Sequence, residues 1–162
     1  MVIVVMGPAG AGKTTVGHAL AARLGWVFVD ADDHHAPASL AKMAAGTPLT
    51  DADRAGWLET LHALVLRAID RREPLVLACS ALTAQHRAHL TGDLRTIRFV
   101  YLRVAPALLR ERLRTRRNHV AGEGLLESQL ATLEEPGPEA LTLDGEADLD
   151  TLIGHVRLEF GL

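Results

Sequence analysis

The stretch Gly7-Pro8-Ala9-Gly10-Ala11-Gly12-Lys13-Thr14 decides the fold of this 162-residue chain. It has the spacing G-x-x-x-x-G-K-T, in which the glycines let backbone N–H groups turn inward around a phosphate. Such a loop needs a strand before it and a helix after it. Val2–Val5 is a β-branched apolar run, and Lys13–Leu24 has apolar residues at helical spacing with Gly25 as its stop. The sequence therefore predicts a phosphate-binding loop between a buried strand and a helix.

Strands and helices alternate along the rest of the chain. Further strands are predicted at Trp26–Val29, Leu75–Cys79, Ile97–Leu102 and Ala140–Leu143. Further helices are predicted at 39–45, Asp51 to about Arg72, Thr83–Leu90, Pro106–Arg117, Leu125–Leu133 and Leu149–Phe160. This alternation predicts an α/β fold, a three-layer α/β/α sandwich with a five-stranded, mainly parallel sheet. Residues 1–162 contain no linker or repeat, so we expect a single P-loop domain.

The composition excludes several classes of protein. A net charge of −3 argues against a general nucleic-acid binder, and the single cysteine excludes an intramolecular disulfide. The apolar start runs directly into the phosphate loop without a basic leader, and no segment has the length to span a bilayer. We expect a soluble, cytoplasmic protein whose partner is a small molecule, with neither nucleic acid nor membrane.

The phosphate loop predicts the nucleotide contacts. Lys13 is expected to reach the β- and γ-phosphates, Thr14 to offer its hydroxyl to Mg²⁺, and Thr15 to support the α-phosphate. ATP and Mg²⁺ are therefore the expected cofactors. The backbone that cradles the phosphates comes from Gly7, Ala9, Gly10, Ala11 and Gly12. A nucleotide-binding regulator without catalysis is the alternative from a different functional class.

An acidic cluster, Asp30-Ala31-Asp32-Asp33-His34-His35, follows the second predicted strand. If strand geometry continues, Asp30 and Asp32 share a side and point toward the phosphate loop, because ligand sites collect at this edge of α/β sheets. Phosphoryl transfer to a hydroxyl needs a carboxylate to orient the acceptor and take its proton, and Mg²⁺ needs oxygen ligands. A helix-capping turn is the simpler interpretation. The two histidines are weak candidates for metal ligands, and contacts to substrate hydroxyls or solvent exposure are favoured.

Arginines crowd the end of the helix that begins at Pro106. Arg112 and Arg116 are four residues apart and share a helix face. That face can serve a nucleotide, with one guanidinium stacking on adenine and the other stabilising charge on the transferring phosphoryl group. A solvated charged face is the alternative.

The chain resembles the gluconokinase family of small P-loop kinases, which are built like shikimate kinase and the nucleoside monophosphate kinases. The Lys42–Arg54 stretch, followed by Trp57-Leu58 and Ala78-Cys79-Ser80-Ala81-Leu82, is the most specific part of the resemblance. The match also includes the phosphate loop, the acidic cluster from Asp30 to Pro37, and the segments Arg112–His119, Leu125–Gln129 and Thr132–Pro136. It covers nearly the whole chain in order.

This resemblance implies ATP-dependent phosphorylation of D-gluconate at its 6-hydroxyl, giving 6-phospho-D-gluconate. It implies Asp32 as the base, Asp30 near Mg²⁺ directly or through water, Arg112 at adenine and Arg116 as catalytic. The implied substrate contacts are Asp32, His34, Lys42, Arg54, Ser80 and Arg87. It further implies an acceptor-binding insertion at about 31–56, a mobile lid at about 117–125 that His119 helps to close, and a homodimer. Solvated surface charge is the plain alternative for Lys42 and Arg54.

Several residues depart from the family pattern on the acceptor side and near the expected lid. They are Ser39, Gly56, Thr83, His86 and Val120. The phosphate loop carries none of these departures. They leave open a second interpretation, a kinase of the same fold that acts on another small sugar acid or polyol.

Overall fold

The computed structural model describes residues 1–92, 94, 96–115 and 123–162. Its sheet has five strands in the order β2-β3-β1-β4-β5, and every neighbouring pair is parallel. The strands are β1 (Val2–Met6), β2 (Val27–Asp30), β3 (Leu75–Ala78), β4 (Ile97–Arg103) and β5 (Ala140–Asp144). The predicted α/β fold is confirmed, and each strand lies within one residue of its predicted limits.

The helices of the described residues also follow the prediction closely. They are α1 (Lys13–Leu24), α2 (Pro37–Ala44), α3 (Asp51–Asp70), α4 (Ala84–Thr91), α5 (Pro106–Thr115), α6 (Glu123–Thr132) and α7 (Leu149–Phe160). Local chemistry sets their ends: Gly25 ends α1 with a φ of 67°, and Thr50 and Asp53 form a reciprocal capping box at the start of α3. None of these described helices combines the length and apolarity needed to cross a membrane.

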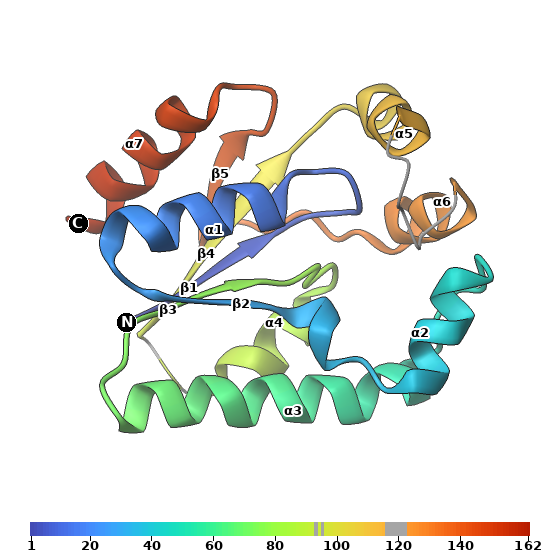
Figure 1. Cartoon of the computed structure of the whole chain (residues 1–162), viewed down its shortest axis with the longest axis horizontal. Coiled ribbons are helices and arrows are strands. Elements are labelled where there is room, and N and C mark those ends of the chain that lie inside the picture. Colours follow the sequence, from blue (N-terminus) through green and yellow to red (C-terminus); the bar gives the residue numbers. More distant parts are fainter. Residues whose placement is uncertain (93, 95, 116–122) are drawn as a thin grey trace.

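β1 lies at the centre of the fold, and all five of its residues are fully buried. Alternate side chains face opposite sides of the sheet, because the strand repeats every two residues. Val2, Val4 and Met6 pack in the cluster that contains α3, whereas Ile3 and Val5 pack with residues of α1 and α7. The result is three layers, with α3 and α4 on one face and α1 and α7 on the other (Figure 1).

The parallel register brings the carboxyl ends of the central strands to one edge. Val5 is paired with Ala78 of β3, and Met6 with Tyr101 of β4. The backbone N–H of Gly7 then donates to the Ser80 carbonyl at 3.3 Å, so the phosphate loop and the segment after β3 lie side by side. In open α/β sheets this edge is where ligands bind.

The expectation that strand geometry continues from Asp30 through Asp32 is wrong. The chain turns at Ala31 into a short 3₁₀ helix, η1 (Ala31–His34), which agrees with the alternative interpretation of the cluster as a capping turn. The side chain of Asp30 caps this turn by accepting the backbone N–H of Asp32 at 3.1 Å. An aspartate cap favours such a turn over an extended strand because it satisfies an N–H that the turn leaves unpaired.

Two leucines of α3 test how much the helical layer of α3 and α4 contributes to stability. Leu61 is fully buried beneath the sheet, whereas Leu66 is 41% exposed on the same helix. We expect Leu61→Ala to lower the free energy of unfolding by about 2–5 kcal/mol, because it removes buried methyl groups and leaves a cavity. Leu66→Ala should change it by no more than about 0.5 kcal/mol. Urea unfolding of the two variants measures both values, and equal losses would contradict the assignment of the core.

Candidate active site

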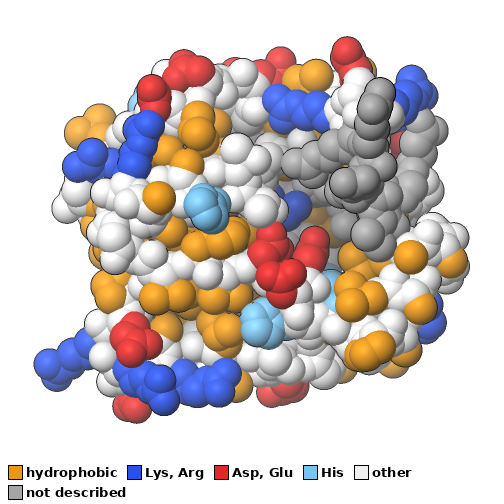
Figure 2. Space-filling view, viewed as in Figure 1, with side chains coloured by type: hydrophobic (Ala, Val, Ile, Leu, Met, Phe, Trp, Pro, Cys, Tyr) orange, Lys and Arg blue, Asp and Glu red, His pale blue; other side chains and the backbone are white. Residues whose placement is uncertain are grey.

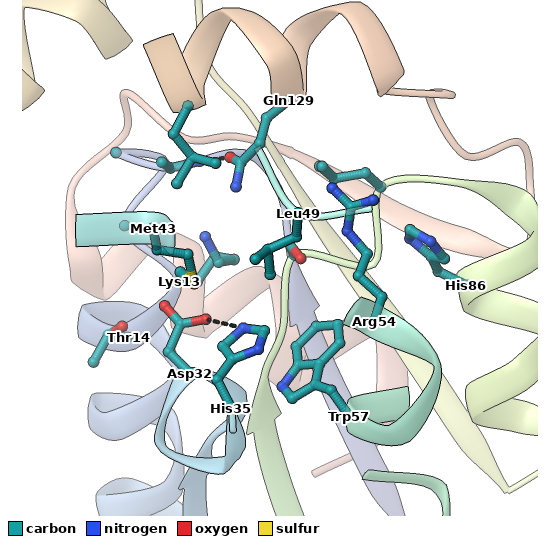
Figure 3. Close-up of a pocket in the computed structure, with 16 residues that line it drawn as sticks. Lys13, Thr14, Asp32, His35, Met43, Leu49, Arg54, Trp57, His86 and Gln129 are labelled. Carbon is teal, nitrogen blue, oxygen red and sulfur yellow. Dashed lines mark hydrogen bonds and ion pairs between the residues drawn. The ribbon is translucent and has the colours of Figure 1, made fainter. Parts of the chain in front are cut away.

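A pocket opens at the carboxyl edge of the sheet, between the phosphate loop, η1, α3 and α6 (Figure 3). Apolar groups of Met43, Leu49 and Trp57 form part of its wall. Its polar side chains come from separate parts of the chain: Lys13, Thr14, Asp32, Arg54, Ser80 and Gln129. The pocket therefore brings the phosphate loop together with the acidic turn and α3.

Glycine is required at two points of the phosphate loop. Gly10 has a φ of 84° and Gly12 a φ of 97°, both in the left-handed region that side chains rarely adopt. A Cβ on Gly10 would also lie 3.3 Å from the Leu109 carbonyl oxygen. These conformations shape the concave loop at the start of α1, where backbone N–H groups and the helix end favour an anion.

Thr14 and Asp30 form a direct link between the phosphate loop and the end of β2. The Thr14 hydroxyl donates to Asp30 Oδ2 at 2.7 Å, while Oδ1 of the same carboxylate caps η1. A hydroxyl beside a carboxylate is an oxygen donor set of the kind that Mg²⁺ prefers. The described ranges contain no group of three His, Cys, Asp or Glu side chains suited to a metal ion. A magnesium ion held here would therefore also need oxygens from its nucleotide.

Asp32 lies on the pocket wall, and its side chain is 65% exposed. Asp32 and Asp33 are exposed residues of η1, and Figure 2 shows acidic side chains gathered on this face of the molecule. His35 Nε2 lies 3.7 Å from Asp32 Oδ1. Asp32 is thus placed where the sequence expected it, but by a turn and not by a strand.

His35, and not the predicted His34, lines the pocket. Its ring stacks on the indole of Trp57 with centroids 4.5 Å apart, and Trp57 Nε1 donates to the Ala31 carbonyl at 2.8 Å. Burial lowers the pKa of His35 below its usual 6.5, although the Asp32 carboxylate acts in the opposite direction. Burial therefore favours the neutral form of the imidazole. The 3₁₀ turn decides which histidine faces inward, and the sequence offered a turn here only as the alternative to a continued strand.

The two predicted cationic substrate contacts separate in the structure. Lys42 donates to both carboxylate oxygens of Asp53, at 2.7 and 2.8 Å, and is not among the residues that line the pocket. This ion pair joins α2 to the start of α3. Arg54 does line the pocket, and its side chain is only 17% exposed, with Nη1 3.5 Å from Asp51. Arg54 is therefore the cation of this pair that faces the cavity.

Ser80 and Arg87 also differ in their placement. Ser80 lies on the pocket wall, directly after β3. Arg87 is buried, is not among the lining residues, and donates to the carbonyls of Ala81 and Glu134 at 3.3 and 3.0 Å. Ala81 has a φ of 45°, a conformation that costs energy for a residue with a side chain. Arg87 thus supports the backbone that presents Ser80.

Arg112 lies in a second groove, on the other side of the phosphate loop. It donates to the carbonyls of Gly10 and Gly145 at 3.3 and 3.2 Å, and Thr15 lines the same groove. The guanidinium is therefore next to the loop, as predicted for a nucleotide contact. Arg116, His119 and Val120 lie outside the described residues, as does most of the predicted lid.

Sequence reasoning gave no role to Gln129 and treated His86 only as a departure from the family pattern. The backbone N–H of Ala9 donates to Gln129 Oε1 at 2.7 Å, and both side chains line the pocket. Burial, followed by the charge of Arg54, lowers the pKa of His86, so a neutral imidazole faces the acceptor side. Gln129 is separated from Ala9 by 120 positions, and no local pattern could connect them.

Known proteins resemble this chain over nearly its whole length. A family model described as an AAA domain matches residues 2–136. A gluconokinase from Gluconobacter oxydans (strain 621H) is 44% identical over 163 residues, covering 97% of this chain and 92% of that protein. The unliganded structure of a sugar kinase from Janibacter sp. HTCC2649 superimposes with a TM-score of 0.92 at 34% identity, covering 99% of this chain and 94% of that one. A gluconokinase from Sinorhizobium meliloti 1021 has a TM-score of 0.82 at 36% identity, with 98% and 93% covered.

The link between α2 and α3 should weaken in acid. Hydrogen bonds from Lys42, and then from Thr50, lower the pKa of Asp53 from 3.8 to about 2. Stability from a depressed carboxyl pKa is fully present above the ordinary value and is lost as the pH falls toward the folded value. We therefore expect wild type to be more stable than Asp53→Asn at pH 6, with a difference that shrinks toward pH 3. Urea unfolding across this range checks it, and a constant difference would contradict it.

Proposed function

The chain belongs to the gluconokinase family, and from this premise we propose that it transfers the γ-phosphate of ATP to the 6-hydroxyl of D-gluconate. The product is 6-phospho-D-gluconate. One observation carries the proposal. A single pocket joins Lys13 and Thr14 of the phosphate loop to a carboxylate, Asp32, and to an inward-facing guanidinium, Arg54.

The donor half of the reaction belongs to the phosphate loop. The N–H groups of Gly7, Ala9 and Ala11 are bonded within the protein. The other backbone N–H groups of the loop and the Lys13 ammonium hold the phosphates, and Arg112 supports the loop through the Gly10 carbonyl. Thr14 and Asp30 would hold Mg²⁺, which when bound neutralises charge on the phosphate oxygens. Asp30 fixes the Thr14 hydroxyl at the start of α1.

The acceptor half belongs to η1, α3 and the segment after β3. Asp32 accepts the proton of the attacking hydroxyl, and His35 lines the pocket beside it. Arg54 binds the carboxylate of the sugar acid, a pairing that its planar fork of N–H donors suits. Ser80 contributes a hydroxyl for the polyol chain. Lys42 acts through Asp53 to hold α2 against α3, and not on the substrate directly.

A kinase of the same fold with another sugar acid as acceptor is the second candidate. His86 supports this candidate. Its buried imidazole lines the pocket at a position where the sequence departs from the family pattern, so the pocket can suit a different acceptor. The donor half is the same for both candidates. Only the acceptor separates them.

Purified protein with ATP and Mg²⁺ should phosphorylate D-gluconate. Product formation is followed by coupling to 6-phosphogluconate dehydrogenase, and ADP release is measured in parallel with a panel of acceptors. Because Arg54 offers a cation to a carboxylate, we expect acidic sugars to react at least about tenfold better than the matching neutral polyols. ADP release with a different sugar acid, but not with gluconate, would favour the second candidate. Nucleotide binding without acceptor-stimulated release would identify a regulator.

Asp32→Asn should lower kcat by about 100-fold or more, because an amide cannot take the hydroxyl proton. The KM for ATP should change little, since the carboxylate faces the acceptor and not the phosphate loop. Asp33→Asn is the matched control: it is the next residue, is exposed and does not line the pocket. Steady-state kinetics of the two variants make the comparison. Full activity of Asp32→Asn would remove Asp32 from the role of base.

A further inference from the structure

The phosphate loop holds the side chain of Gln129 in one orientation. The backbone N–H of Ala9 donates to Gln129 Oε1 at 2.7 Å. A primary amide carries one acceptor oxygen and, on the opposite branch, an NH₂ group with two donors. Since the oxygen faces the loop, the NH₂ group is turned away from Ala9. In Figure 3 the amide nitrogen of Gln129 points into the pocket.

The helix that carries Gln129 is firmly anchored. Leu125 and Leu126 of α6 are 4% and 0% exposed. Glu127 accepts two hydrogen bonds from Arg110 of α5, at 2.6 and 3.1 Å. The amide is consequently fixed at two points. The phosphate loop holds its oxygen, and the packed helix α6 holds the backbone that carries the side chain. A group fixed in this way can act on a reaction without first being ordered.

The Gln129 amide lines the same pocket as the Lys13 ammonium. Lys13 Nζ lies 3.1 Å from the carbonyl oxygen of Pro8, the residue before Ala9. The lysine of such a loop reaches the β- and γ-phosphates. Gln129 and Lys13 therefore contact adjacent residues of the phosphate loop and line the same pocket. Phosphoryl oxygens only accept hydrogen bonds, and the group that faces them here is a donor.

We propose that Gln129 is a catalytic residue whose amide N–H donates a hydrogen bond to an oxygen of the transferring phosphoryl group; this rests on the proposed kinase function. In the step it assists, a bond forms between the acceptor hydroxyl oxygen and phosphorus. The bond from phosphorus to the leaving ADP oxygen breaks, and the hydroxyl proton passes to Asp32. Gln129 gains and loses no proton. It stabilises charge that spreads over the phosphoryl oxygens in the transition state.

Two substitutions separate this role from that of a structural tie. Gln129→Glu keeps an oxygen for the N–H of Ala9 but removes both donors, whereas Gln129→Met removes the tie and the donors at similar length. Gln85→Glu is the control for the added negative charge, because Gln85 is exposed on α4 and does not line the pocket. Each variant is compared with wild type in kcat, both KM values, ATP affinity and the slow ADP release without acceptor.

We expect Gln129→Glu and Gln129→Met each to lower kcat by about 10- to 100-fold, the range for a hydrogen bond to a charged group. The KM for gluconate should stay within about twofold of wild type. ADP release without acceptor should fall by a similar factor, because hydrolysis transfers the same phosphoryl group. Gln85→Glu should retain the wild-type values.

Other outcomes would overturn the proposal. Wild-type kcat in Gln129→Glu, with loss only in Gln129→Met, would make Gln129 a structural tie of the phosphate loop. A raised KM for gluconate at unchanged kcat would make it an acceptor contact. Tighter ATP binding by Gln129→Met would show that the side chain blocks the loop. Failure of the proposed function is seen separately, as absence of gluconate turnover in wild type.

Discussion

The pairing of β1 with a parallel neighbour on each side is the constraint on which the rest of the structure depends. Its side chains are buried on both faces of the sheet, so each must suit the layer it meets. A slip of one residue would move Val4 and Met6 to the opposite layer and carry the phosphate loop out of line with Ser80. The register therefore fixes the core and the site together.

The site itself is held by hydrogen bonds between separate elements. Thr14 joins the phosphate loop to Asp30, and Trp57 joins α3 to the Ala31 carbonyl. These two bonds hold the acidic turn at Asp30 and Ala31. The next residue, Asp32, lines the pocket. The first bond joins the two residues that would hold Mg²⁺, and the second holds the backbone of the turn from α3.

Much of the fold followed from local patterns. Gly25, Thr50 and Pro106 mark helix ends because each satisfies or removes a backbone group at a terminus. Continuous apolar runs predicted the buried strands, because a parallel strand in the middle of a sheet is covered on both faces. At Asp30 the sequence left both a continued strand and a capping turn open. A capping carboxylate competes with strand propensity, and the pattern of residues alone does not show which prevails. Because of this turn, His35 lines the pocket in place of the predicted His34.

The sequence by itself determined the phosphate loop, the alternation of strands and helices, and the residue types available for phosphoryl transfer. These depend on spacings of a few residues, where chain geometry leaves little choice. Only the tertiary structure decided which charged groups face the cavity. Lys42 forms an ion pair with Asp53, and Arg87 donates hydrogen bonds to backbone carbonyls. Gln129 is oriented by the N–H of Ala9. Each of these outcomes depends on a partner that packing brings close. A long side chain can reach in several directions, and the sequence does not show which partner the fold will place beside it.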